Sequence, residues 1–258
     1  MNFTSGPTDL RGWSVICLRP AMQQAAVKRR VHARGGQHVT LPGLRLEALA
    51  ASDALGQALA CTAVVFTSPA AVHFAARLCR LQPVAGQHMV AVGEGTARAL
   101  ARHHIRAITP PPTVMHSEGV LALPTWDEVT GPVGLVTAPG GRGVIDAGLA
   151  ARGFQRVRAE VYQRLPPLPT PRQIEALRAA SAPRAVLVTS GEALDGVLAA
   201  LPASARALLQ QSVAVCSSPR LAQLAANHGL VSRIEASAPT TSAMLDALSK
   251  HAATQTMR

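Results

Sequence analysis

Residues 64–72 read VVFTSPAAV, and residues 186–194 read VLVTSGEAL. Each stretch begins with a run of β-branched and other apolar residues, continues with Thr-Ser, and leads into a helical pattern. The apolar run is typical of a buried strand, and a serine directly before a helical pattern is a favoured helix N-cap. The chain therefore contains the same predicted strand-to-helix junction twice.

The repetition extends beyond these two junctions. Thr67 and Thr189 are 122 positions apart, and further pairs of similar segments occur in the same order at offsets between 118 and 125. The pairs are ARGGQHV (33–39) with ARGFQRV (151–157), MVAVGEGTARALARHH (89–104) with SVAVCSSPRLAQLAANH (212–228), and SEGVLAL (117–123) with SAMLDAL (242–248). Their order and nearly constant offset indicate an internal duplication of about 120 residues.

Short β-branched runs alternate with longer helical patterns in each half. This alternation predicts an α/β fold with parallel sheets, and four to five strands per half suit a Rossmann-like or flavodoxin-like lobe. Two proline-rich stretches, 109–116 and 164–173, are linker candidates, and the second is interpreted as a crossing between lobes. In the first half we expect strands at 14–18, 38–41, 63–66 and 89–92, and helices at 21–34, in a stretch ending at 59, at 69–81, at 95–103 and from 117.

The composition limits the class of protein. The chain has 258 residues, of which 48% are hydrophobic, and its formal net charge is +11. Arginine supplies almost all of the positive charge. Arginine pairs well with carboxylates and phosphates, so anionic ligands are favoured, although the base composition of the genome is an alternative origin of the charge. Four cysteines without metal-ligand spacing predict free thiols in a reducing compartment. No signal peptide or membrane span is expected, so we predict a cytoplasmic protein.

Polar and glycine residues follow several predicted strands. In an open parallel sheet, ligands bind beyond the carboxyl ends of the strands, where helix N-termini present free N–H groups that attract anions. The sequence thus predicts a rim of anion-binding corners, and the alternative is that each serine only caps its helix. The corners are Thr67-Ser68, Gly93 to Thr96, Ala138 to Arg142, Thr189-Ser190 and Ser217-Ser218.

Common catalytic motifs are absent from the sequence. GEGTARAL has Arg98 where a dinucleotide fingerprint needs its third glycine, and no P-loop, GxSxG or HExxH occurs. Nucleic-acid binding is disfavoured because the chain has only seven aromatic residues and no recognition motif. An enzyme with this inventory would work by orienting its substrate more than by metal or strong acid–base chemistry.

The ordered segments resemble the uroporphyrinogen-III synthase family over most of the chain. The matching segments include LRPAMQQAAVKRRVHARGGQHVTLPGLRLE, AVVFTSPAAVHFAARL, VAVGEGTARAL, HSEGVLALP, GGRGVIDAGLAARGFQRVRAEVYQR and VLVTSGEAL. The resemblance implies two α/β lobes joined by a two-stranded β linker with an intervening cleft. It further implies that lobe one consists of residues 1–40 plus 166–258 and lobe two of residues 41–165.

The resemblance also implies an activity. Members of the family cyclise hydroxymethylbilane, a polycarboxylate linear tetrapyrrole, to uroporphyrinogen III in haem biosynthesis, with inversion of ring D and loss of water through an azafulvene and a spiro intermediate. No cofactor or metal is implied, and neither is a nucleic-acid or membrane partner. A monomer is expected, and a transient contact with hydroxymethylbilane synthase is left open. The alternative is a non-catalytic tetrapyrrole-binding or sensing module of the same fold.

Site residues are implied in the same way. Tyr162 is the candidate that assists departure of the substrate hydroxyl, and its alternative role is to anchor the lobes. The loop CSSPR departs from the family's glycine-containing form, although Ser218 and Arg220 resemble a serine–arginine version of it. The implied substrate-binding residues are Arg19, Thr67, Ser68, Gly95, Thr96, Ser117, Arg142, Thr189, Ser190 and Ser218.

Overall fold

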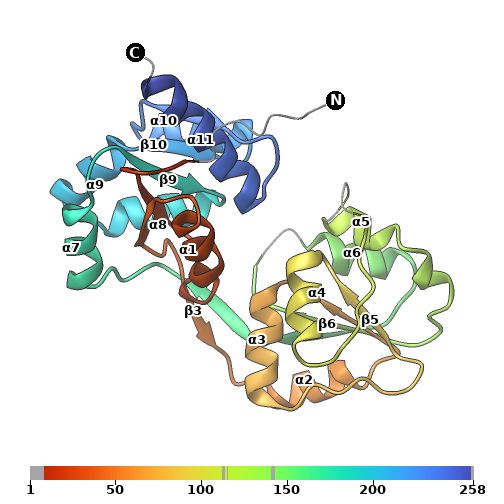
Figure 1. Ribbon diagram of the computed structural model, residues 1–258. Helices are drawn as coiled ribbons and strands as arrows, with labels where there is room; N and C mark the ends of the chain where they lie inside the picture. The colour runs from red at the N-terminus through yellow and green to blue at the C-terminus, as the bar shows by residue number, and fades with distance from the viewer. Residues whose placement is uncertain (1–8, 112–113, 115, 141–142, 257–258) are drawn as a thin grey trace, which may run out of the picture. The chain divides into compact units, whose positions relative to one another are not determined.

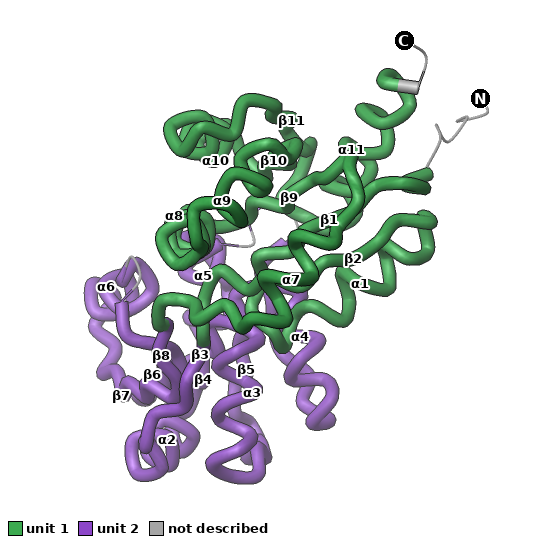
Figure 2. The backbone as a smooth tube through the Cα atoms, turned by 90° about the vertical axis from the view of Figure 1, so that its left-hand side faces the viewer, with its two compact units in different colours: residues 1–45, 165–258 green, residues 46–164 purple. Residues whose placement is uncertain are grey.

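The computed structural model describes residues 9–111, 114, 116–140 and 143–256. The chain divides into two compact units, of which unit 1 comprises residues 1–45 and 165–258, and unit 2 comprises residues 46–164 (Figure 2). Unit 1 is thus assembled from the two ends of the chain, and unit 2 from its middle.

Unit 1 contains a parallel sheet, of which β9 and β10 are labelled in Figure 1, and its strand order is β11-β10-β9-β1-β2. Alternate residues of β1 face opposite sides: Ile16 packs with α7, α8, α9 and α10, whereas Val15 packs with α1 and α11. Helices therefore cover both faces of the sheet. The elements are β1 (Ser14–Cys17), η1 (Ala21–Gln23), α1 (Gln24–His32), β2 (Gln37–Thr40), α7 (Pro171–Ala179), β9 (Arg184–Val188), α8 (Gly191–Ala200), α9 (Ala203–Gln210), β10 (Val213–Cys216), α10 (Pro219–Asn227), β11 (Arg233–Glu235) and α11 (Thr241–Thr256).

Unit 2 contains a second parallel sheet with strand order β5-β4-β6-β7. In β4, Phe66 packs with α2, α3 and α4, and Val65 packs on the other face with α5 and α6. The predicted α/β class with parallel sheets is therefore confirmed. The elements are α2 (Ser52–Leu59), β4 (Ala63–Phe66), α3 (Pro69–Leu78), β5 (His88–Ala91), α4 (Glu94–Ala101), α5 (Ser117–Leu121), η3 (Pro124–Asp127), β6 (Val133–Thr137), α6 (Val144–Ala151) and β7 (Arg156–Glu160).

The strands β3 (Arg45–Ala48) and β8 (Tyr162–Leu165) lie where the chain passes from one unit to the other. They pair with each other in a separate two-stranded sheet. Residues 45–48 fall in the stretch that the sequence pattern predicts as helical, so that prediction is wrong for β3. Pairing with β8 decides the conformation here, because strand formation depends on a partner more than on local preference.

The two sheets reveal how the duplicated halves are combined. By the sequence repeat, β4 and β5 correspond to β9 and β10, and β6 and β7 correspond to β1 and β2. Under this correspondence both sheets have the same strand order. Each unit takes one strand pair from each half of the chain, and β11 has its counterpart in the parallel bridge from Val90 to Ile108.

Candidate functional site

In unit 2, Thr67 joins the carboxyl ends of two neighbouring strands. It follows β4, and its hydroxyl donates a hydrogen bond to Oγ1 of Thr137, the last residue of β6, at 2.9 Å. The chain order reverses between β4 and β6, and such a switch point is where ligands bind in open parallel sheets. Thr137 was missed by sequence reasoning, although its place at the end of a predicted strand could have revealed it.

Ser68 is the N-cap of α3, as the sequence pattern predicts. Its Oγ accepts a hydrogen bond from the backbone N–H of Ala71 at 3.0 Å, and Pro69 occupies the first helical position. The same Oγ lies 3.1 Å from the hydroxyl of Tyr162. Ser68 thus has two neighbours at once, a helix amide and the single tyrosine of the chain.

Tyr162 begins β8 and is only 2% exposed. Its ring stacks on Phe74 of α3, with 5.3 Å between ring centroids and an interplanar angle of 11°. The guanidinium of Arg164 lies 5.9 Å from the Tyr162 ring centroid. The ring is therefore held in the core of unit 2, and its hydroxyl is held at the Ser68 corner.

The first turn of α4 lies beside this corner. A Cβ built on Gly95 would be 3.5 Å from the Pro69 ring, which brings the N-terminal turns of α3 and α4 together. Thr96 is 3% exposed, and its backbone N–H bonds to the Gly93 carbonyl. Ser117 begins α5, which covers the other face of the sheet. It therefore does not lie with the N-terminal turns of α3 and α4.

In unit 1, the candidates follow three neighbouring strands: Arg19 follows β1, Thr189 and Ser190 follow β9, and Ser218 follows β10. Ser190 caps α8 by accepting from the Ala193 N–H at 3.3 Å. Ser218 is the N-cap of α10, but its side chain makes no capping hydrogen bond. Its hydroxyl is therefore not committed to that helix.

Gln24 shapes the loop that carries Arg19, and no sequence pattern indicates this. Its side-chain Nε2 donates to the backbone carbonyls of Cys17 at 3.0 Å and of Arg19 at 2.5 Å. Gln24 is 6% exposed, and its Oε1 is buried without a hydrogen-bonding partner among the described residues. Both amide protons thus fix the path of the chain just after β1.

The structure brings the candidates together in two groups, one in each unit. Unit 2 holds Thr67, Ser68, Gly95, Thr96 and Tyr162, and unit 1 holds Arg19, Thr189, Ser190 and Ser218. Arg142 lies outside the described residues.

The cysteines near the strand ends do not supply nucleophiles. Burial raises the pKa of the Cys17 thiol, and burial together with the nearby Glu235 raises the pKa of Cys216 to about 11. Both therefore stay protonated near neutral pH, and a thiol is a poor nucleophile. Among the described residues, no three His, Cys, Asp or Glu side chains gather in a way that could hold a metal ion.

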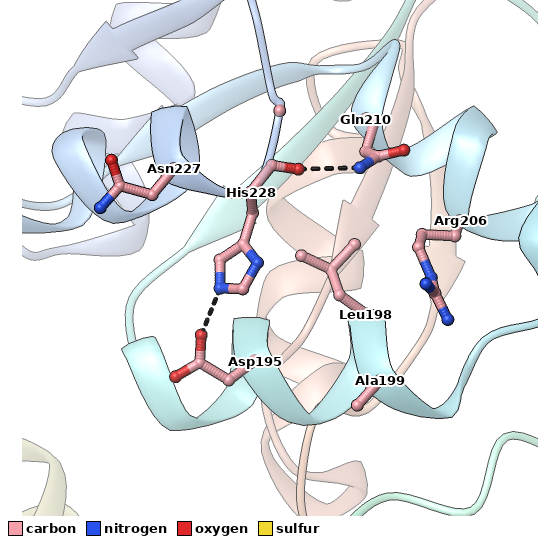
Figure 3. Close-up of a pocket in the computed structure, with 8 residues that line it drawn as sticks. Asp195, Leu198, Ala199, Arg206, Gln210, Asn227 and His228 are labelled. Atoms are coloured by element: carbon pink, nitrogen blue, oxygen red, sulfur yellow. Dashed lines mark hydrogen bonds and ion pairs between the residues drawn. The ribbon is translucent and has the colours of Figure 1, made fainter.

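A pocket of about 540 Å³ lies elsewhere in unit 1 (Figure 3). It contains a hydrogen bond between His228 Nε2 and Asp195 Oδ1 at 2.6 Å, and Gln210 Nε2 donates to the His228 carbonyl at 2.8 Å. Its walls come from the middle of α8 and the ends of α9 and α10, whereas the site candidates lie at the starts of α8 and α10. The pocket shares no residue with either candidate group.

A family model described as uroporphyrinogen-III synthase HemD matches residues 25–246. The chain belongs to the uroporphyrinogen-III synthase family. The match spans parts of both units and includes Ser68, Ser190 and Ser218, whereas Arg19, which follows β1, precedes it. Within the described part of the chain, no helix combines the length and apolar character needed to cross a membrane.

Solved structures share the fold of this family member. A uroporphyrinogen-III synthetase from Helicobacter pylori is 17% identical, covering 96% of this chain and 100% of that chain, with a TM-score of 0.62. A mutant uroporphyrinogen III synthase from the extremely thermophilic bacterium Thermus thermophilus is 19% identical over 94% of this chain and 99% of that chain, with a TM-score of 0.52. No curated protein sequence matches the chain.

Proposed function

We propose that this chain is a uroporphyrinogen-III synthase, a hydro-lyase that cyclises hydroxymethylbilane to uroporphyrinogen III with inversion of ring D and loss of water. The family match over residues 25–246 is the observation that carries the proposal. Four free cysteines support a cytoplasmic location as part of it, because free thiols persist in reducing compartments.

The candidate corners suit a substrate with many carboxylates. In both units they combine serine or threonine hydroxyls with the free N–H groups of a helix N-terminus, which stabilise negative charge. The net charge of +11 attracts such a ligand over longer distances. We therefore include Ser190, Ser218 and Arg19 in unit 1, and Gly95 and Thr96 in unit 2, as substrate-binding residues.

The outcome of the reaction depends on the conformation in which the substrate is held more than on acid–base or metal catalysis. Hydroxymethylbilane loses its hydroxyl readily and closes by itself to the type I isomer, so the enzyme must favour the inverted closure. Holding the carboxylates at several fixed corners restricts the conformations of the linear chain before it closes. This mechanism requires neither a cofactor nor a metal.

A coupled assay tests the proposal directly. Hydroxymethylbilane is generated in situ by hydroxymethylbilane synthase, this chain is added, and the oxidised products are separated into type I and type III isomers. We expect type III to dominate, and the reaction without this chain gives type I as the control. Type I alone, formed at the uncatalysed rate, would contradict the proposal.

The same assay, combined with a binding measurement, distinguishes an active enzyme from a non-catalytic sensing module. A module that has lost turnover would bind the tetrapyrrole without changing its isomer ratio or rate of closure. Titration of the chain with uroporphyrinogen III in the absence of oxygen, followed by the fluorescence of the two tryptophans, measures binding independently of turnover. Binding with an unchanged isomer ratio would therefore favour the non-catalytic alternative.

A further inference from the structure

The Ser68 hydroxyl oxygen accepts two hydrogen bonds from within unit 2 if Tyr162 is a donor. One donor is the backbone N–H of Ala71 at 3.0 Å, and the other group in contact is the Tyr162 hydroxyl at 3.1 Å. A serine hydroxyl has two acceptor positions and one proton. The direction of the second bond therefore decides where the Ser68 proton points.

Burial determines that direction. Tyr162 is 2% exposed and its ring packs on Phe74, and Ser68 is the hydrogen-bonding partner that the structure records for its hydroxyl among the described residues. If Ser68 donated to Tyr162, the tyrosine proton would be buried without an acceptor, which is unfavourable. Tyr162 is therefore the donor, and both acceptor positions of Ser68 are filled.

We propose that Ser68 donates the hydrogen bond to the departing hydroxyl of the substrate, and that Tyr162 is a positioning residue acting through Ser68. The inference rests on the proposed function. Ser68 is half-buried and stands at the carboxyl end of β4, so its proton is directed away from its two protein donors. Tyr162 lies behind it in the core.

The hydrogen-bond chain strengthens Ser68 as a donor. Donation from the Ala71 amide and the Tyr162 hydroxyl withdraws electron density from the serine oxygen, and hydrogen bonds in a chain reinforce one another. In the assisted step, the C–O bond of the hydroxymethyl group breaks and its electron pair goes to oxygen. The lone pair of the pyrrole nitrogen forms a C=N bond, the displaced ring π electrons form the exocyclic C=C bond, and the nitrogen then loses its N–H proton, so hydroxide and a proton leave together as water. Ser68 stabilises the negative charge that grows on the departing oxygen.

Variants of the two residues test this arrangement by a double-mutant cycle on kcat. We expect Ser68→Ala to lower kcat for type III formation at least about tenfold and to leave KM within about twofold of the wild-type value. The reason is that the hydrogen bond from Ser68 to the departing oxygen strengthens only as the C–O bond breaks, so its loss affects the transition state more than substrate binding. Tyr162→Phe should lower kcat less, and the double variant should be no slower than Ser68→Ala. The losses are not expected to multiply, since both variants interrupt one chain of hydrogen bonds.

Three further variants separate this role from helix capping. Ser68→Thr keeps a hydroxyl and a capping oxygen and should retain most of the activity. Ser68→Gly is a good N-cap without a hydroxyl, so it should fold and yet lose kcat as Ser68→Ala does. Ser190→Ala removes the equivalent cap in unit 1, where Ser190 accepts a hydrogen bond from the Ala193 N–H, and its effect should multiply with that of Tyr162→Phe.

Each contrary outcome has a distinct meaning. The inference is overturned if the losses of kcat in Ser68→Ala and Tyr162→Phe multiply in the double variant. It is also overturned if Tyr162→Phe alone is as slow as the double variant while Ser68→Ala is nearly as fast as wild type. In both cases the wild-type chain still makes type III isomer, so the proposed function survives. A wild-type chain that makes only type I overturns the proposed function and this inference together.

Discussion

At the residue scale, His38 is a histidine that folding holds in its neutral form. Its imidazole is half-buried on β2, and its Nε2 is buried without a hydrogen-bonding partner among the described residues. Burial, followed by the positive charges of His32 and Lys28 on α1, lowers the pKa of His38 from 6.5 to about 4. Protonating His38 therefore opposes folding.

The sign of the pH dependence follows from these pKa values. Between pH 6.5 and 4 the unfolded chain binds more protons at this residue than the folded one, so the free energy of unfolding falls as the pH drops, and the full contribution is present above pH 6.5. Because solvent reaches part of the ring, we expect a loss of about 1 kcal/mol between pH 7 and pH 5. Urea unfolding at both pH values measures it. His38→Gln removes this titration, and an identical pH dependence in variant and wild type would refute the assignment.

At the scale of elements, the loop after β2 is built around a close backbone contact in unit 1. The N–H of Gly43 bonds to the Leu18 carbonyl at 2.8 Å, and a Cβ on Gly43 would collide with the Ala193 carbonyl in the first turn of α8. The end of β1, this loop and the start of α8 are thus packed backbone to backbone. The Ser190 corner depends on that packing because Ser190 caps α8.

We expect Gly43→Ala to lower the free energy of unfolding by about 2 kcal/mol, since a methyl group there must displace α8 or the loop. Gly56→Ala is the matched control, because Gly56 is exposed on α2 and a Cβ there meets no atom within 4 Å. This control should be neutral or stabilising by up to about 1 kcal/mol. Denaturant unfolding of both variants checks the difference, and equal effects would argue against the close contact.

At the scale of the whole molecule, the boundaries of the duplicated halves and of the folded units differ. The first half of the sequence contains β1, β2, β4 and β5, but β1 pairs with β9 and β4 pairs with β6 of the second half. Both hydrophobic clusters of unit 2 lie entirely within residues 46–164. Folding units are therefore set by strand partners and not by the repeat.

Two fragments of equal length test this difference. Residues 46–164 contain a complete sheet with both of its faces covered, so we expect this fragment to unfold cooperatively on heating. Residues 10–128 approximate one sequence repeat and retain only the pairs β1–β2 and β4–β5, so they should show no cooperative transition. Circular dichroism during heating distinguishes them. A folded 10–128 fragment, or an unfolded 46–164 fragment, would contradict the division.

The sequence alone determined the kind of fold and the location of the corners. The periodic apolar runs and the repeated Thr-Ser junctions predicted parallel α/β units, and Ser68 and Ser190 cap α3 and α8 as expected. These features are local, since a strand pattern and an N-cap depend on neighbouring residues. The resemblance of the ordered segments also indicated the family that the family model identifies.

Only the tertiary structure decided which strands pair and which serine and threonine hydroxyls form hydrogen bonds with distant residues. β3 forms through its pairing with β8, and the Thr-Ser stretch at 67–68 acquires a contact that its sequence does not indicate, because Tyr162, 94 residues away, reaches Ser68. Gln24 and Thr137 acquire their roles in the same way. Such contacts join residues far apart in the chain, so no local pattern encodes them, and the packing of the folded core sets them.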